Sequence, residues 1–174
     1  MLYRFVALTE RDARAVIAWR YDEQYSFYNI DPVVLDMTVK EMLDGAHRAV
    51  VDERGELVGF FVVGPAAQVP GGHEHGIYTG NNTLDIGLGL RPDLTGLGLG
   101  LSFVQACLDF ALQEFKPATF RLVVATFNRR ATRVYERAGF RPVTTFTSMT
   151  SKGDTEFLLM TRYAWIYGLP TNKE

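Results

Sequence analysis

Three glycines at alternate positions lie directly before an apolar segment with helical spacing, in the run TGLGLG at residues 95–100. Glycine costs about 0.5–1 kcal/mol relative to alanine inside a regular element, so its repeated use here needs a chemical reason. The first amides of a helix have no partner within the helix, and the helix dipole places partial positive charge there. Glycines let a bulky anion approach those amides. The run therefore predicts a phosphate-binding turn at a helix N-terminus.

Two common phosphate-binding motifs fit this run poorly. A P-loop needs a lysine after its last glycine, but the chain has no lysine between Lys40 and Lys116. A dinucleotide-binding G-x-G-x-x-G motif needs its third glycine at residue 101 or 103, and these are leucine and phenylalanine. That motif also belongs to the first β-α unit of its fold, whereas this run follows a predicted β-hairpin.

The elements that position this turn follow from hydrophobic periodicity and turn signals. Strands are expected over residues 2–8, 47–53, 56–64, 83–90, 119–127, 140–149 and 155–163. Helices are expected from a capping box at 9–12, over 38–45 behind a second capping signature, and over 101–115 and 128–139. Residues 65–82 are expected to form a long loop rich in Gly, Pro and Asn. This order predicts one α/β domain over residues 1–174, in which antiparallel hairpins flank a parallel β-α-β unit.

Composition and charge exclude several classes of protein. The net charge is −2, without a block of basic residues, so no nucleic-acid partner is expected. No apolar run approaches about 18 residues, so no membrane span is expected. Charged residues within the first dozen positions argue against a signal peptide, and a cytoplasmic protein is the default. The one cysteine, Cys107, allows no internal disulfide and is expected to be a small buried residue.

Two segments together resemble the GNAT superfamily of N-acetyltransferases. The run at 95–100, preceded by LRPDL at 90–94, is similar to the family's motif A, whose core is [QR]-x-x-G-x-[GA]. The segment NRRATRVYERAGF at 128–140 is similar to motif B, and the order of elements over about 2–163 also matches. The resemblance implies a single-domain GNAT fold with a mixed, mostly antiparallel sheet. That sheet is splayed between its fourth and fifth strands and has helices on both faces.

The resemblance also implies how acetyl-CoA binds. The strand backbone at Leu88, Gly89 and Leu90 would pair with the pantetheine arm, one of its amides would polarise the thioester carbonyl, and the amides of 96–101 would hold the pyrophosphate. Thr95 departs from the family, which usually has Gln or Arg there, and so removes one side-chain contact. Gly87 and Gly89 fit a close backbone approach or a simple packing bulge. The residues expected to bind the cofactor are Leu88, Gly89, Leu90, Thr95, Gly96, Leu97, Gly98, Leu99, Gly100, Leu101 and Asn128.

The implied reaction is direct attack of a primary amine on the thioester, without an acyl-enzyme. Tyr135 aligns with the family tyrosine that protonates the departing thiolate, and a core aromatic on an amphipathic helix is the alternative. Asp85 is a candidate general base, near the place where relatives carry an acidic residue. His73, Glu74 and His75 are further candidates, but they also fit an ordinary polar loop, and no metal site is expected.

The aromatic segment at 19–32 lies where the family's first two helices form the floor of the acceptor site. Trp19, Tyr21, Tyr25 and Tyr28 are the residues expected to bind the acceptor, with core packing as the alternative. A small amine, an amino acid, an antibiotic or a protein N-terminus all remain possible acceptors.

Two further expectations concern assembly and a rival function. A homodimer is possible through the last hairpin or through YAWIYGLP at 163–170. A catalytically silent acyl-CoA-binding sensor or interaction module with the same fold is the alternative to an enzyme.

Overall fold

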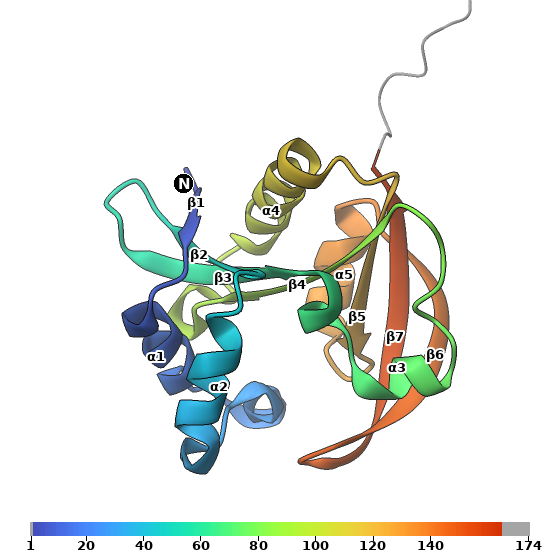
Figure 1. Ribbon diagram of the computed structural model, residues 1–174, viewed down its shortest axis with the longest axis horizontal. Coiled ribbons are helices and arrows are strands. Elements are labelled where there is room, and N and C mark those ends of the chain that lie inside the picture. Colours follow the sequence, from blue (N-terminus) through green and yellow to red (C-terminus); the bar gives the residue numbers. More distant parts are fainter. Residues whose placement is uncertain (1, 165–174) are drawn as a thin grey trace, which may run out of the picture.

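The computed structural model describes residues 2–164, which form one seven-stranded sheet in the order β1-β2-β3-β4-β5-β7-β6 (Figure 1). Neighbouring strands are antiparallel except β4 and β5, which are parallel. The strands are β1 (Arg4–Ala7), β2 (His47–Val51), β3 (Leu57–Val63), β4 (Thr83–Leu90), β5 (Thr119–Ala125), β6 (Arg141–Thr150) and β7 (Gly153–Tyr163). The α-helices are α1 (Glu10–Ala18), α2 (Leu35–Met42), α3 (Pro70–Glu74), α4 (Gly100–Phe115) and α5 (Arg129–Arg137).

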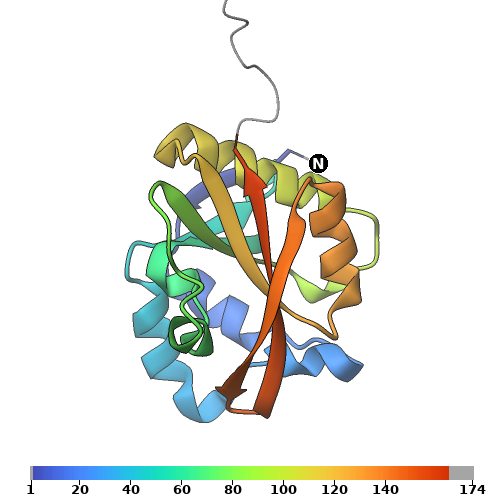
Figure 2. The same cartoon turned by 90° about the vertical axis from the view of Figure 1, so that its right-hand side faces the viewer.

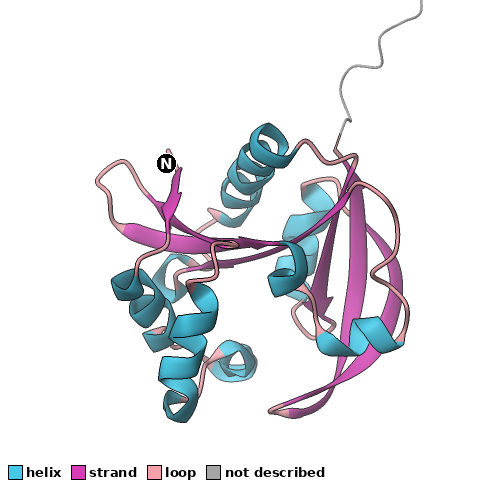
Figure 3. Cartoon of the chain, viewed as in Figure 1, coloured by secondary structure: helices cyan, strands magenta, loops and turns pink. Residues whose placement is uncertain are grey.

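Helices cover both faces of this sheet, as the coloured elements in Figure 3 show. On one face α4 and α5 pack over the central strands, and this side holds the largest apolar cluster, which includes Phe61, Phe103 and Phe120. On the other face α1 and α2 cover β3, where Ala13 and Ile17 form a second cluster. None of the helices within residues 2–164 has the length and apolarity needed to cross a membrane.

The alternation of side chains along β5 explains why the two faces differ. Phe120, Leu122 and Val124 enter the cluster beneath α4, whereas the intervening Arg121 turns to the opposite face. Successive residues of a strand point to opposite faces, so one polar residue in an apolar strand is directed away from its neighbours.

The sheet divides between β4 and β5, as expected. These strands pair only from Thr83–Thr119 to Asp85–Arg121, and no ladder joins them beyond that point. We call the point after Asp85 and Arg121 the fork. Figures 1 and 2 show β5, β7 and β6 turning away from the half of the sheet formed by β1 to β4. A strand edge within the sheet is thereby left open.

Two of the expected boundaries were wrong for reasons of local chemistry. Helix α2 begins at Leu35 rather than at Thr38, because a 3-10 turn capped by Asp31 leads directly into it. The segment 65–82 is not a plain loop, since it contains a 3-10 turn over Gly64–Ala67 and the short helix α3, in which Pro70 occupies the first turn. By contrast, the capping box of Thr9 and Asp12 at the start of α1 is confirmed.

The last hairpin is tighter than expected. Thr150 pairs with Gly153, so β6 and β7 are joined by two residues instead of five. Gly153 has a φ of 95°, which favours glycine at this turn. The possible dimer segment spans residues 163–170, and its part from residue 165 onward lies outside the described residues.

Candidate active site

A cavity of about 1240 Å³ opens at the fork and extends beneath the aromatic segment that follows α1. It contains most of the predicted site. The predicted residues that line it are Trp19, Tyr21, Tyr25, Tyr28, Leu88, Gly89, Leu90, Thr95, Gly96, Gly98, Gly100, Leu101, Asn128 and Tyr135. Leu97, Leu99 and Asp85 do not line it.

Glycine occurs in the turn at residues 95–100 for two separate physical reasons. Gly96 and Gly98 both have a φ of 79°, in the left-handed region that L side chains rarely adopt. No atom lies within 4 Å of a Cβ built on either residue, so the space over their backbone is open. At Gly100 the constraint is close packing instead, because a Cβ there would lie 3.2 Å from the side chain of Val134 of α5. Open backbone at a helix N-terminus fits an anionic group.

The hydroxyl proton of Thr95 is not free to bind such a group. Its hydroxyl donates to the carbonyl of Pro92 at 2.7 Å and so stabilises the approach to the glycine turn. Leu99, at the N-cap of α4, makes no side-chain capping bond to the helix. An anion at this turn would therefore be held by backbone amides rather than by the side chain of residue 95.

We expect Gly98→Ala to weaken acetyl-CoA binding by about tenfold. An alanine at a positive φ costs about 1–2 kcal/mol, and relaxation of that strain would turn the following amides away from the bound anion. Calorimetric titration with acetyl-CoA measures the dissociation constant.

Gly55→Ala is the matched control for this prediction. Gly55 has a φ of 83° in the turn between β2 and β3, and it does not line the cavity. The Gly55→Ala variant should lose about as much stability as Gly98→Ala, and its affinity for acetyl-CoA should not change. Equal affinities for Gly98→Ala and the unmodified protein would contradict the assignment of the turn.

The open edge of β4 offers the backbone of alternate residues. Arg91 donates its amide to the carbonyl of Val58 at 2.8 Å, so Gly89, two residues earlier, also faces β3. The amides and carbonyls of Leu88 and Leu90 therefore face the gap beyond the fork. Gly89 also lines the cavity, but, contrary to our expectation, its amide and carbonyl pair with β3 and are not free to bind a ligand.

Gly87 and Gly89 instead make room for side chains of β3. A Cβ on Gly89 would lie 2.3 Å from the ring of Phe60, and one on Gly87 would lie 2.9 Å from Val62. The ladder between β3 and β4 runs without a register shift, so neither glycine marks a bulge. Phe60 and Val62 thus lie over β4 and line the cavity.

The aromatic segment contacts the predicted cofactor site directly. Tyr21 donates its hydroxyl to the carbonyl of Leu90 at 2.9 Å, and burial raises the pKa of Tyr21 to about 12. The phenol therefore stays a hydrogen-bond donor at physiological pH. One of the carbonyls expected to pair with the pantetheine arm is engaged by a residue expected to bind the acceptor.

Asn128 joins the aromatic segment to α5. Its Oδ1 accepts from the amide of Ala131 at 3.1 Å and caps the helix, while its Nδ2 donates to the hydroxyl of Tyr28 at 3.1 Å. Beside it, the guanidinium of Arg130 lies 4.2 Å from the centre of the Tyr25 ring. Asn128 thus caps α5, and it also holds Tyr28 at the cavity.

Tyr135 lies on α5 with its ring 6.0 Å from that of Phe140, and it lines the cavity. Burial raises its pKa above the ordinary value of 10.0. Its hydroxyl makes no hydrogen bond within residues 2–164, unlike those of Tyr21 and Tyr28. A protonated phenol that faces a cavity in this way can donate a proton to a bound group.

The candidate bases lie elsewhere. Asp85 is buried and forms an ion pair with Arg121, and both of its carboxylate oxygens accept hydrogen bonds from that guanidinium. His73 and Glu74 belong to the short helix α3, and the Nδ1 atom of His75 lies 2.8 Å from the Gly71 carbonyl oxygen. None of these four side chains lines the cavity.

The residues that shape the site and that the sequence interpretation missed include Gln68 and Arg121. Gln68 lines the cavity and bonds to Asp85 at 2.6 Å. A sequence signal existed for Arg121 alone, because an arginine within the apolar strand TFRLVVA requires a buried partner. No pattern marks Gln68, since its partner lies 17 residues away in the chain.

Comparison with known proteins shows the family and the fold. A family model described as the acetyltransferase (GNAT) domain matches residues 3–141. A GNAT-family acetyltransferase from Bacillus anthracis is similar in structure, with a TM-score of 0.70 at 18% identity over 93% of this chain and 95% of that one. A chimera of the Vibrio cholerae spermidine N-acetyltransferase SpeG and hSSAT has a TM-score of 0.67 at 17% identity, over 94% and 96% of the two chains. No curated protein sequence matches this chain.

Proposed function

The chain belongs to the GNAT acetyltransferase family, and on this premise we propose that it transfers the acetyl group of acetyl-CoA to a primary amine. The observation that carries the proposal is the meeting of three features in one cavity. These are the glycine turn at the start of α4, the open edge of β4 beyond the fork, and the partner-free hydroxyl of Tyr135.

The cavity suits a long, bent acyl-CoA. The open backbone at Gly96 and Gly98 would hold the pyrophosphate, and the free backbone of Leu88 would pair with the pantetheine arm. Arg130 and Arg137 also line this cavity, and they add positive charge near the turn, where Thr95 provides none. Acetyl-CoA supplies an activated acyl group, and its departing thiolate needs a proton.

Tyr135 supplies that proton in the proposed reaction. The amine nitrogen attacks the thioester carbon, a C–N bond forms, and the C–S bond breaks. The hydroxyl of Tyr135 protonates the sulfur and regains a proton from the new amide nitrogen through water, so no net proton is consumed. Cys107 is fully buried in α4 and burial raises the pKa of its thiol, which supports direct transfer without an acyl-enzyme.

Two measurements test the proposal in sequence. Calorimetric titration should show micromolar binding of acetyl-CoA and none of NADH, the ligand of the dinucleotide motif that the glycine turn does not match. Thiol release should then be followed with a panel of amines. Spermidine belongs in that panel because solved structures of similar fold include spermidine N-acetyltransferases, and 2-phenylethylamine and an N-terminal peptide represent apolar and protein acceptors.

A second candidate function is an acyl-CoA-binding module without chemistry. The ion-paired state of Asp85 and the engaged hydroxyl of Thr95 favour it, because two side chains expected to serve the site are bonded elsewhere. Tight acetyl-CoA binding with no thiol release from any amine would select this function over the enzyme.

A further inference from the structure

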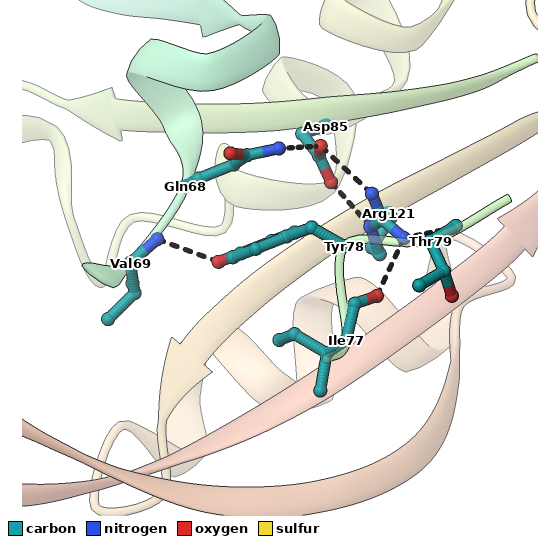
Figure 4. A network of polar contacts seen from close by, with 7 residues as sticks. All are labelled: Gln68, Val69, Ile77, Tyr78, Thr79, Asp85 and Arg121. Carbon is teal, nitrogen blue, oxygen red and sulfur yellow. Dashed lines mark hydrogen bonds and ion pairs between the residues drawn. The ribbon is translucent and has the colours of Figure 1, made fainter. Parts of the chain in front are cut away.

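A buried polar network lies at the fork (Figure 4). Arg121 donates from Nε to Asp85 Oδ1 at 2.5 Å and from Nη2 to Asp85 Oδ2 at 3.0 Å. Its Nη1 donates to the carbonyls of Ile77 and Thr79 at 2.8 and 2.7 Å, and the guanidinium lies 5.1 Å from the centre of the Tyr78 ring. Arg121 therefore ties the segment 77–79 to the last paired position of β4 and β5.

This network fixes the orientation of the Gln68 amide. The Nε2 atom of Gln68 donates to Asp85 Oδ2 at 2.6 Å. A carboxylate paired with a guanidinium can only accept hydrogen bonds, so the amide nitrogen rather than the oxygen must face Asp85. Figure 4 shows the carbonyl oxygen of Gln68 turned away from Asp85. That oxygen has no hydrogen-bond partner among residues 2–164.

The surroundings of Gln68 make this free oxygen significant. Its neighbours in the cavity wall are apolar, namely Ala66, Ala67, Val69 and Pro70. Ala67 lies over Gly87 of β4, since a Cβ on that glycine would approach the Ala67 Cβ to 3.7 Å. Gln68 is therefore the one polar side chain that this wall, residues 66–70, presents to the cavity. It stands on the face of the sheet covered by α1 and α2.

We propose that Gln68 is a specificity-determining residue whose side-chain carbonyl accepts a hydrogen bond from the N–H of the acceptor amine. Asp85 and Arg121 are then positioning residues, which act through Gln68 and do not touch the substrate. This inference rests on the proposed function and assigns Asp85 a different role from that of general base. An ammonium or amine N–H is the donor that complements a lone carbonyl on an apolar wall.

Nuclear magnetic resonance of the glutamine side-chain amides tests the orientation without any turnover. Gln68→Met identifies the Gln68 signals by their loss. One Gln68 amide proton should exchange slowly with solvent because it is bonded to a buried carboxylate. Gln113 on α4 is exposed and gives the reference for a free amide. Exchange of the Gln68 amide as fast as that of Gln113 would overturn the proposed orientation.

The same signals identify the donor that binds the carbonyl. Protein saturated with CoA is titrated with 2-phenylethylamine, and apoprotein is titrated with acetyl-CoA alone. A shift of the Gln68 amide on addition of the amine supports the proposal. An equal shift with acetyl-CoA alone would assign the oxygen to the pantetheine amide and overturn the amine role, as would no shift with either ligand.

Kinetics then separate substrate recognition from folding. Gln68→Met should raise the KM for the amine about tenfold, because the variant loses one hydrogen bond to a charged or polar donor. The KM for acetyl-CoA should change less than about twofold. Gln113→Met, the matched control, should change neither constant. An unchanged amine KM in Gln68→Met would overturn the inference. Failure of every amine to release thiol would reject the proposed function, and the amide titration would still decide the role of Gln68.

Discussion

Replacing Tyr135 with phenylalanine is expected to lower kcat for acetyl transfer by about 100-fold, within the range for loss of a general acid. The variant removes one oxygen from a side chain that lines the cavity, and that oxygen makes no hydrogen bond among the described residues. Packing against Phe140 is retained, because the ring remains. Acetyl-CoA affinity should therefore stay unchanged while turnover falls, and the two are measured by calorimetry and by thiol release.

The pH dependence of the unmodified enzyme tests the same assignment. A general acid must be protonated, and burial raises the pKa of Tyr135 above the ordinary 10.0. The phenol therefore stays protonated throughout the neutral and mildly alkaline range, and activity is lost only as the pH rises through the raised pKa. We expect no decline of kcat attributable to this group below about pH 10.

Tyr3 provides the control for Tyr135. Its hydroxyl is buried without a partner among residues 2–164, and its ring packs against Phe103 but does not itself line the cavity. Tyr3→Phe should leave kcat unchanged. An undiminished kcat in Tyr135→Phe, or an equal loss in Tyr3→Phe, would refute the general-acid role.

The second large effect concerns stability. Arg121→Met is expected to lower the free energy of unfolding by about 3–5 kcal/mol, because it leaves the buried carboxylate of Asp85 without a counter-ion. The carbonyls of Ile77 and Thr79 would also lose their donor. Urea denaturation followed by circular dichroism gives the midpoint and the slope from which this free energy is obtained.

A double variant distinguishes the ion pair from simple loss of packing. Asp85→Leu combined with Arg121→Met removes both charges, and we expect it to recover part of the lost stability. Arg14→Met is the control, because Arg14 bonds to Glu10 and Asp36 at the surface and should leave the midpoint almost unchanged. A midpoint for Arg121→Met equal to that of Arg14→Met would show that the pair contributes nothing.

Local signals in the sequence were sufficient for most of the elements and for the glycine turn. The capping box of Thr9, the cap formed by Asn128 and the glycines at 96 and 98 each act within a few residues, so their chemistry is visible in the order of amino acids. The start of α2 was misplaced because two candidate starts compete there, and the turn capped by Asp31 precedes the one at Thr38.

Contacts between distant segments could not be predicted in this way. Gly87 and Gly89 suggested a bulge or a bound ligand, but the pairing of β3 with β4 shows that Phe60 and Val62 occupy their space. Asp85 suggested a base from its position in a strand. Only the register of β4 against β5 places Arg121 opposite it, and only the fold of residues 64–82 brings Gln68 to it.

By itself, the sequence determined the α/β class, the order of the strands and of the four longer helices, the glycine turn and the family that these features resemble. Each depends on periodicity, on backbone conformation or on motifs read along the chain. The tertiary structure decided which backbone groups of β4 face the open edge, which polar side chains are buried in pairs and which oxygen is left for a ligand. These depend on strand register and on contacts across the sheet, because such contacts join residues that no local pattern connects.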